Sequence, residues 1–233
     1  MTTPLFVERH PGTGRPVAFL HGLASRGSQD WPESEWAGVF GDRPRVVVDL
    51  PAHGASPSLG TAPTSTVLDA LATAVGPDEI DLVGYSLGAR LAWDLARHPR
   101  VSVRRLVLGG LSAGGAVRAR RPRRRARASV SGGAAPADPL TGMIVHLASQ
   151  EGNRPAELVD LVEGLASEPF VAGSDGPAQP TLLLGGMDDA MAAGIDDLAR
   201  LLPDAHTQRV PGDHVAAVHT AEFRAATRAF LSD

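Results

Sequence analysis

The chain of 233 residues contains neither cysteine nor lysine, and aromatic residues make up only 4% of it. The absence of cysteine excludes disulfides and thiolate metal ligands. No apolar stretch approaches the roughly 20 residues that a membrane-spanning helix needs, and the N-terminus has no basic segment followed by an apolar run. We therefore expect a cytoplasmic protein without a signal peptide.

The histidines show no ligand-spaced pair on one predicted helix, so we expect no metal site. No Gly-x-Gly-x-x-Gly follows the strand predicted at 105–108, so we expect no cofactor either.

The basic side chains are distributed unevenly. All 22 of them are arginine, against 26 carboxylates, and seven of the arginines fall between residues 118 and 127. This run has no aromatic residues and no helical patterning, which favours a solvated, poorly ordered loop over residues 113–137 rather than a nucleic-acid contact. We expect no nucleic-acid or membrane partner. The oligomeric state cannot be predicted from these features.

Short apolar runs alternate with segments of helical spacing along most of the chain. Runs rich in Val, Leu and Ile without polar alternation are typical of strands that are buried on both faces. We predict strands at 5–8, 17–20, 45–49, 80–85, 105–108, 181–184 and 206–210, and helices at 65–75, 87–98, 192–202 and 221–231. This order predicts an α/β fold with a mostly parallel central sheet flanked by helices. The first two strands are predicted to form a hairpin that turns at Gly12 and Gly14.

One interval interrupts the alternation. Residues 111–178 contain the arginine run and two helical pieces, at 140–150 and 155–166. In an open α/β sheet, an insertion after the carboxyl end of a strand lies above the ligand site. We therefore predict that 111–178 is a small lid on a core made of residues 1–110 and 179–233.

A serine stands between two glycines in the stretch Gly84-Tyr85-Ser86-Leu87-Gly88, which joins a predicted strand to a predicted helix. At a sharp strand-to-helix turn, side chains larger than hydrogen at the glycine positions would crowd the neighbouring backbone. Such a turn lifts the Ser86 hydroxyl out of the sheet and places it at a helix N-terminus, where negative charge is favoured. A serine hydroxyl still needs a base, and that base needs an orienting group.

Both groups are available later in the sequence. Asp188 and Asp189 follow one predicted strand, and His214 and His219 follow the next. The carboxyl ends of these strands are the edge at which Ser86 also emerges. The order serine, acid, histidine is the order that this architecture uses.

Four landmarks together resemble the α/β-hydrolase-fold enzymes, and the resemblance covers essentially all of the chain except 111–178. FLHGL at 19–23 resembles the His-Gly loop that supplies part of an oxyanion hole. DLPAHGASP at 49–57 resembles the family's Asp-x-x-Gly-His-Gly-x-Ser loop, with Ala52 in place of the usual glycine. GYSLG resembles the nucleophile elbow, and GGMD and PGDH resemble the acid turn and the histidine loop.

The resemblance implies a role for each of these residues. Ser86 would be the nucleophile and His214 the base, with His219 as the alternative base. Asp188 would be the acid because the family's acid falls three residues after the first glycine of its turn, with Asp189 as the alternative. The other common acid position, after the preceding strand, offers no carboxylate.

The resemblance also implies an oxyanion hole and a pocket. The backbone N–H groups of Leu23 and Leu87 would hold the oxyanion. Possible substrate-pocket residues are His21, Trp31, Tyr85 and Arg90.

The leading functional hypothesis is a serine hydrolase that cleaves small carboxylic esters or thioesters through an acyl-enzyme on Ser86. A first alternative comes from GYSLGAR, which with Arg90 is similar to the elbow of hydrolase-fold lyases of menaquinone biosynthesis; those enzymes use the same triad to abstract a proton and eliminate pyruvate. Cofactor-free haloperoxidase or perhydrolase activity is a second alternative. A catalytically silent binding module is the alternative outside enzymes.

Overall fold

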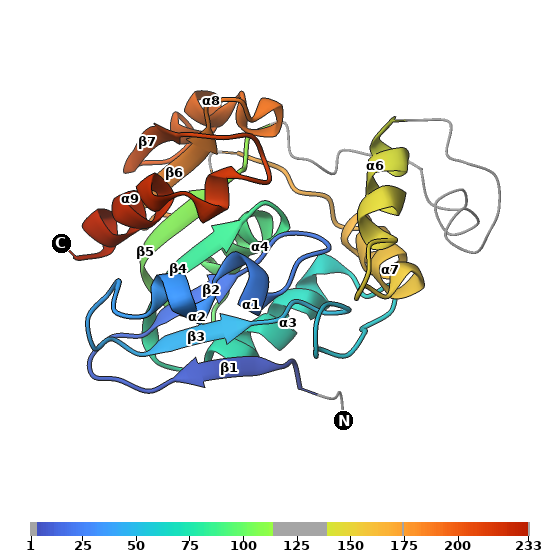
Figure 1. Cartoon of the computed structure of the whole chain (residues 1–233), viewed down its shortest axis with the longest axis horizontal. Coiled ribbons are helices and arrows are strands. Elements are labelled where there is room, and N and C mark those ends of the chain that lie inside the picture. The colour runs from blue at the N-terminus through green and yellow to red at the C-terminus, as the bar shows by residue number, and fades with distance from the viewer. Residues whose placement is uncertain (1–3, 114–138, 174, 233) are drawn as a thin grey trace.

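The computed structural model describes residues 4–113, 139–173 and 175–232 (Figure 1). The arginine-rich loop predicted over 113–137 lies outside these residues except for Ala113. The described segments are built around one central sheet.

Seven strands form this sheet, in the order β1-β3-β2-β4-β5-β6-β7. In chain order the strands are β1 (Val7–His10), β2 (Val17–Leu20), β3 (Arg45–Val48), β4 (Glu79–Tyr85), β5 (Ser102–Gly109), β6 (Thr181–Gly186) and β7 (Ala205–Val210). Only β1 runs antiparallel to its neighbour, and all other pairs are parallel. The predicted mostly parallel α/β sheet is confirmed.

The predicted hairpin between the first two strands is wrong. β1 pairs with β3, with Val7 opposite Val48, and β2 lies on the other side of β3. The connection packs instead against the loop that leads into β3, where the Thr13 N–H donates to the Asp42 carbonyl at 2.7 Å. A Cβ at Gly12 would lie 2.0 Å from that same carbonyl oxygen. The glycine therefore permits a close approach of two loops rather than a hairpin turn.

Helices cover both faces of the sheet (Figure 1). The helices are α1 (Gly27–Asp30), α2 (Glu33–Trp36), α3 (Thr64–Val75), α4 (Leu87–Leu95), α6 (Pro139–Ala148), α7 (Pro155–Leu165), α8 (Ile195–Ala199) and α9 (Ala221–Ser232), with 3-10 turns η1 (Ala190–Ala192) and η2 (Ala217–His219). Within the described chain, no helix is long and apolar enough to cross a bilayer.

Alternate side chains of the strands enter two separate cores. On β2, Ala18 and Leu20 belong to the core that also contains residues of α3, α4 and α8, whereas Val17 and Phe19 belong to the core that contains residues of α2 and α9. All four of these side chains are completely buried. Burial on both faces explains why the strands lack polar alternation.

The carboxyl ends of the parallel strands meet at one edge of the sheet. Between β5 and β6 the chain leaves this edge and forms α6 and α7, which stand beside it in Figure 1. The turn between them contacts the core directly, because Asn153 Nδ2 donates to the Ala24 carbonyl at 3.2 Å and Arg154 Nη2 donates to the Ser56 carbonyl at 2.5 Å. These contacts hold the two helices over the edge from which Ser86 emerges.

Candidate active site

Ser86 occupies the sharp turn between β4 and α4. Its backbone has φ 51° and ψ −111°, a strained conformation for a residue that carries a Cβ. A Cβ at Gly84 would lie 2.5 Å from the Gly88 carbonyl oxygen, and a Cβ at Gly88 would lie 2.2 Å from the Leu20 carbonyl oxygen. Both positions therefore need glycine, because a Cβ at either one would collide with neighbouring backbone. The turn holds the Ser86 side chain at the N-terminus of α4.

Two hydrogen bonds join Ser86 to side chains from later in the sequence. The Ser86 hydroxyl donates to His214 Nε2 at 2.9 Å, and His214 Nδ1 donates to Asp189 Oδ2 at 2.8 Å. The Asp189 side chain is fully buried, whereas 22% of the His214 side chain is exposed. An imidazole oriented by a buried carboxylate can accept the proton of the hydroxyl as that hydroxyl attacks, which is the first step of nucleophilic catalysis.

The acidic partner in this chain is Asp189, and our expectation of Asp188 is wrong. Asp188 is exposed, whereas Asp189 is buried at the start of η1. Asp189 Oδ1 accepts from the backbone N–H groups of Met191 and Ala192 at 2.9 and 3.2 Å, which leaves Oδ2 turned toward His214. The family spacing, counted from the first glycine of the turn, favoured Asp188, but the hydrogen bonds at the start of η1 direct Asp189 inward instead.

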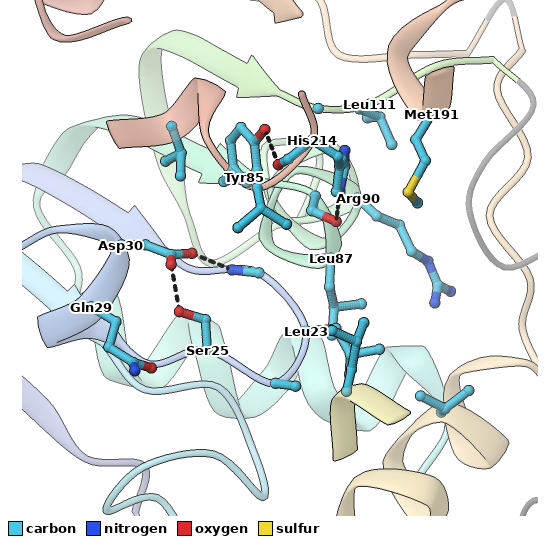
Figure 2. Close-up of a pocket in the computed structure, with 18 of the residues that line it drawn as sticks. Leu23, Ser25, Gln29, Asp30, Tyr85, Leu87, Arg90, Leu111, Met191 and His214 are labelled. Carbon is cyan, nitrogen blue, oxygen red and sulfur yellow. Dashed lines mark hydrogen bonds between the residues drawn. The ribbon is translucent and has the colours of Figure 1, made fainter. Parts of the chain in front are cut away.

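The loop after β7 is fixed around the His214 ring. The Tyr85 hydroxyl donates to the His214 backbone carbonyl at 2.6 Å (Figure 2). Asp213 accepts two backbone N–H groups of the same loop, and these bonds lower the pKa of its carboxyl. A Cβ at Gly110 would lie 2.9 Å from His214 Cε1, so the glycine makes room for the ring. His219, the alternative base, is exposed at the cavity wall, and His214 is the histidine that contacts Ser86.

Two backbone N–H groups beside Ser86 have no acceptor among the described residues. They belong to Leu23 and Leu87, and both residues line the same cavity as Ser86 (Figure 2). Leu87 is the first residue of α4, where the helix dipole favours negative charge. Unpaired donors at such a place suit an oxyanion, and the oxyanion role of these two amides stays a prediction.

Two buried histidines brace the loops on the β2 side of the site. His21 Nδ1 donates to the Gly22 carbonyl and its Nε2 accepts from the Leu50 N–H, while His53 Nε2 accepts from the Ala24 N–H at 2.9 Å. Burial lowers the pKa of His21 to about 4 and that of His53 to about 3. Protonation of Nε2 would break the bond that this atom accepts, so both rings are neutral at physiological pH.

Asp30 was not singled out by the sequence. It ends α1 and is only 6% exposed. Its Oδ2 accepts from the Gly22 N–H at 2.8 Å, and its Oδ1 accepts from the Ser25 hydroxyl. Burial raises the pKa of the Asp30 carboxyl, and the two hydrogen bonds oppose that shift. A single acidic residue in a short helix belongs to no motif, so the sequence offered no signal for it.

A cavity of about 500 Å³ opens at Ser86. Its apolar wall comes from the core, from α6 and α7 and from the loops after β6 and β7, and consists of Leu23, Leu87, Leu111, Leu147, Val162, Leu165, Phe170, Met191, Val215 and Val218. Of the predicted pocket residues, Tyr85 and Arg90 line it. His21 and Trp31 do not line it, because both ring nitrogens of His21 are hydrogen-bonded to backbone groups and Trp31 packs against Phe19 in the core.

Arg90 lies in the cavity wall one helical turn beyond Ser86 and is only 4% exposed. Its Nη2 donates to Thr64 Oγ1 at 2.8 Å and to the carbonyls of Leu165 and Glu168 at 3.2 and 2.8 Å. These bonds tie α4 to α3 and to the end of α7. Nε and Nη1 are buried without a partner in the part of the chain that the structure describes, and burial lowers the pKa of the guanidinium.

Comparison with known sequences gives one matching family model and a set of curated relatives. The model of the alpha/beta hydrolase family matches residues 17–226. A stretch of 88 residues is 44% identical to the 2-succinyl-6-hydroxy-2,4-cyclohexadiene-1-carboxylate synthase of Yersinia pestis, covering 36% of this chain and 31% of that protein. The chain thus matches the curated synthases over only about a third of their length.

Solved structures with the same fold have diverse descriptions. A thermophilic esterase from Thermogutta terrifontis superposes with a TM-score of 0.76 at 22% identity, over 98% of this chain and 93% of the esterase. MenH from S. aureus superposes with a TM-score of 0.75 at 19% identity, over 97% of each chain. At such identities the likeness establishes the fold and leaves the reaction open.

Proposed function

Because this chain belongs to the alpha/beta hydrolase family, we propose that it is a serine hydrolase that cleaves small carboxylic esters or thioesters. The observation that carries the proposal is the pair of hydrogen bonds from Ser86 to His214 and from His214 to Asp189, at 2.9 and 2.8 Å. The pair lies at the wall of a largely apolar cavity. Such a cavity suits an apolar acyl or alcohol group of the substrate.

The proposed mechanism uses the side chains in the order in which they contact one another. His214 Nε2 takes the Ser86 proton as Ser86 Oγ attacks the substrate carbonyl carbon. Asp189 holds the ring and stabilises the imidazolium that forms. The amides of Leu23 and Leu87 donate to the oxyanion of the tetrahedral intermediate, each contributing about 3 kcal/mol in chemistry of this type. His214 then protonates the leaving group, and a water activated by His214 hydrolyses the acyl-enzyme.

A fluorophosphonate probe tests the proposal. We expect the native protein to be labelled, and expect neither the Ser86→Ala variant nor heat-denatured protein to be labelled. A panel of p-nitrophenyl esters of increasing acyl length would then give the preferred chain length. Absence of labelling at several pH values, together with absence of ester turnover, would favour the catalytically silent binding module instead.

A lyase of the menaquinone-biosynthesis type is the second candidate, and Arg90 is the observation that favours it. A buried guanidinium with Nε and Nη1 unpartnered in the described chain can hold an anionic group of a substrate. The matched stretch of the synthase from Yersinia pestis also supports it. However, Nη2 is already committed to three protein oxygens, and Arg90 is the only arginine among the described residues that line the cavity.

Pyruvate release separates the two candidates. A lyase would release pyruvate from the pyruvate-bearing precursor of the product for which those relatives are named, and coupled lactate dehydrogenase would detect it. Arg90→Gln would then raise KM strongly for this anionic substrate and little for a neutral p-nitrophenyl ester. Ester turnover without pyruvate release would leave the hydrolase. Cofactor-free haloperoxidase or perhydrolase activity uses the same residues, and ester and peroxide assays run side by side would distinguish it.

A further inference from the structure

The loop that follows β2 has a selective pattern of backbone hydrogen bonds. The Gly22 N–H donates to Asp30, the Ala24 N–H donates to His53, and the Ser25 N–H donates to the Gly22 carbonyl. Among the described residues, the Leu23 N–H between them has no acceptor. The loop is thus held on both sides of Leu23, whose amide is the one in this loop that the proposed mechanism requires to be free.

Asp30 supports this loop through two hydrogen bonds and, like Ser86, lines the cavity. An ideal Cβ on Gly22 would lie 3.6 Å from Asp30 Oδ2 and 3.6 Å from Ser86 Cβ, so both side chains lie close to Gly22. The two oxygens of the Asp30 carboxylate hold Gly22 and Ser25, the residues that flank the turn (Figure 2). Within that turn Ala24 has φ 61°, a conformation that a residue with a Cβ keeps only when its surroundings impose it.

We propose that Asp30 is a positioning residue of the oxyanion hole, whose carboxylate holds Gly22 and Ser25 so that the Leu23 N–H stays available beside Ser86. This inference rests on the proposed function. Asp30 touches the loop and takes no part in proton transfer between Ser86 and His214. Its loss should therefore weaken binding of the transition state, in which the oxyanion is present, and leave binding of the ground state almost unchanged.

Kinetics of two Asp30 variants test the proposal. In Asp30→Ala, which loses both contacts, kcat should fall at least tenfold, within the limit of about 10²–10³-fold that follows the loss of one oxyanion donor, while KM changes less than about twofold. In Asp30→Asn, the amide oxygen can accept from Gly22 and the amide nitrogen can donate to Ser25, so most of the rate should return. A trifluoromethyl ketone, which forms a tetrahedral adduct, should lose affinity for Asp30→Ala in proportion to kcat.

The matched control is Asp81→Asn, which changes another buried acid at the opposite end of β4. It should lower the melting temperature and leave kcat unchanged. Wild-type kcat in Asp30→Ala would overturn the proposal. So would a loss of kcat that Asp81→Asn reproduces at equal stability, or a change confined to KM.

Hydrogen–deuterium exchange separates failure of this inference from failure of the proposed function. The peptide covering residues 20–31 should exchange faster in Asp30→Ala than in the wild type and Asp81→Asn. This measurement requires no substrate. If the wild type neither reacts with fluorophosphonate nor turns over esters, the proposed function fails, and unchanged exchange in Asp30→Ala would still overturn the positioning role by itself.

Discussion

Asp189 uses its two carboxylate oxygens for different purposes. Oδ1 accepts the backbone N–H groups of Met191 and Ala192, which fixes the side chain at the start of η1, and Oδ2 accepts from His214. The N–H groups of η1 hold the carboxylate, and the carboxylate in turn stabilises the first residues of η1. This arrangement explains why the exposed neighbour Asp188 cannot substitute for it without rebuilding the turn.

Exchange of a single oxygen for nitrogen tests the acid at this scale. In Asp189→Asn, the amide oxygen can still accept from the turn while the amide nitrogen faces His214, so the ring adopts the tautomer that cannot take the Ser86 proton. We expect kcat to fall by about 10⁴-fold, the effect of the same change in a serine protease, with little change in melting temperature. Asp188→Asn is the control and should retain wild-type kcat. The reverse result would restore Asp188 as the acid.

The buried histidines link the stability of the site to pH. His21 and His53 have pKa values of about 4 and about 3 because burial disfavours their charged forms. In the unfolded chain these histidines bind protons near pH 6.5, whereas in the folded chain they stay neutral at that pH. The free energy of unfolding therefore falls as pH drops from about 6.5 toward 4. We expect a loss of about 2 kcal/mol for each ring by about pH 5. The raised pKa of Asp30 acts in the opposite direction and offsets part of this loss.

Urea denaturation at about pH 7.5 and about pH 5 measures this difference. His53→Gln should make the dependence shallower, because an uncharged side chain replaces one of the two rings. His206→Gln, at an exposed position on β7, should leave it unchanged. Equal slopes in all three proteins would show that the buried rings do not control acid stability.

At the scale of elements, the strand–turn–helix unit of β4 and α4 has almost no spare room. The helix starts so close to the end of β2 that position 88 has no space for a methyl group, and Gly84 faces the backbone of α4 in the same way. Close approach of backbone to backbone cannot be relieved by a rotamer change. The elbow geometry therefore depends on two residues that take no part in the proposed chemistry.

Two alanine substitutions of opposite sign test this argument. Gly88→Ala would place a Cβ 2.2 Å from the Leu20 carbonyl oxygen, so we expect a loss of about 3 kcal/mol or more in unfolding free energy and loss of activity. Gly142→Ala, in α6, would meet nothing within 4 Å and should stabilise the protein by about 0.5–1 kcal/mol through helix propensity. Thermal denaturation of both variants measures the difference. A neutral Gly88→Ala would mean that the elbow can relax.

At the scale of the whole molecule, the edge opposite the site is held together by charge. Asp81 is completely buried and accepts from Arg104 at 2.8 Å and from Arg43. The same two guanidinium groups donate to the Leu231 carbonyl at 2.6 and 3.1 Å and so cap the C-terminal end of α9. One acid thus joins β4, the loop before β3 and the last helix.

Removal of that charge should affect stability and leave turnover unchanged. In Asp81→Asn the buried carboxylate that Arg43 and Arg104 contact loses its charge, and we expect a cost of about 1–3 kcal/mol in unfolding free energy. Ester turnover per folded molecule should match the wild type, because the change lies at the far end of β4 from Ser86. A large loss of kcat would show that the two edges of the sheet are coupled.

Features that depend on neighbouring residues were present in the sequence. The unalternated strands predicted the sheet, and the elbow with its two glycines predicted the sharp turn at Ser86, because local sterics determine both. The choice of His214 as the base came from the resemblance to the family. Ala52 also marks its loop, since it adopts φ 65° where the family has glycine. Such requirements act within a few residues and can be recognised from the chain alone.

Only the tertiary structure decided which partner each group meets. The Asp188 N–H donates to the Gly212 carbonyl at 3.1 Å, and a Cβ at Gly186 would lie 2.2 Å from that carbonyl, so contact between two distant loops sets the turn that directs Asp189 to His214. Tertiary contacts also decide that Asp30 binds Gly22 and Ser25, and that β1 pairs with β3. The energies that choose between adjacent carboxylates or alternative strand partners arise from contacts between segments far apart in the chain, and no short stretch of sequence contains both sides of such a contact.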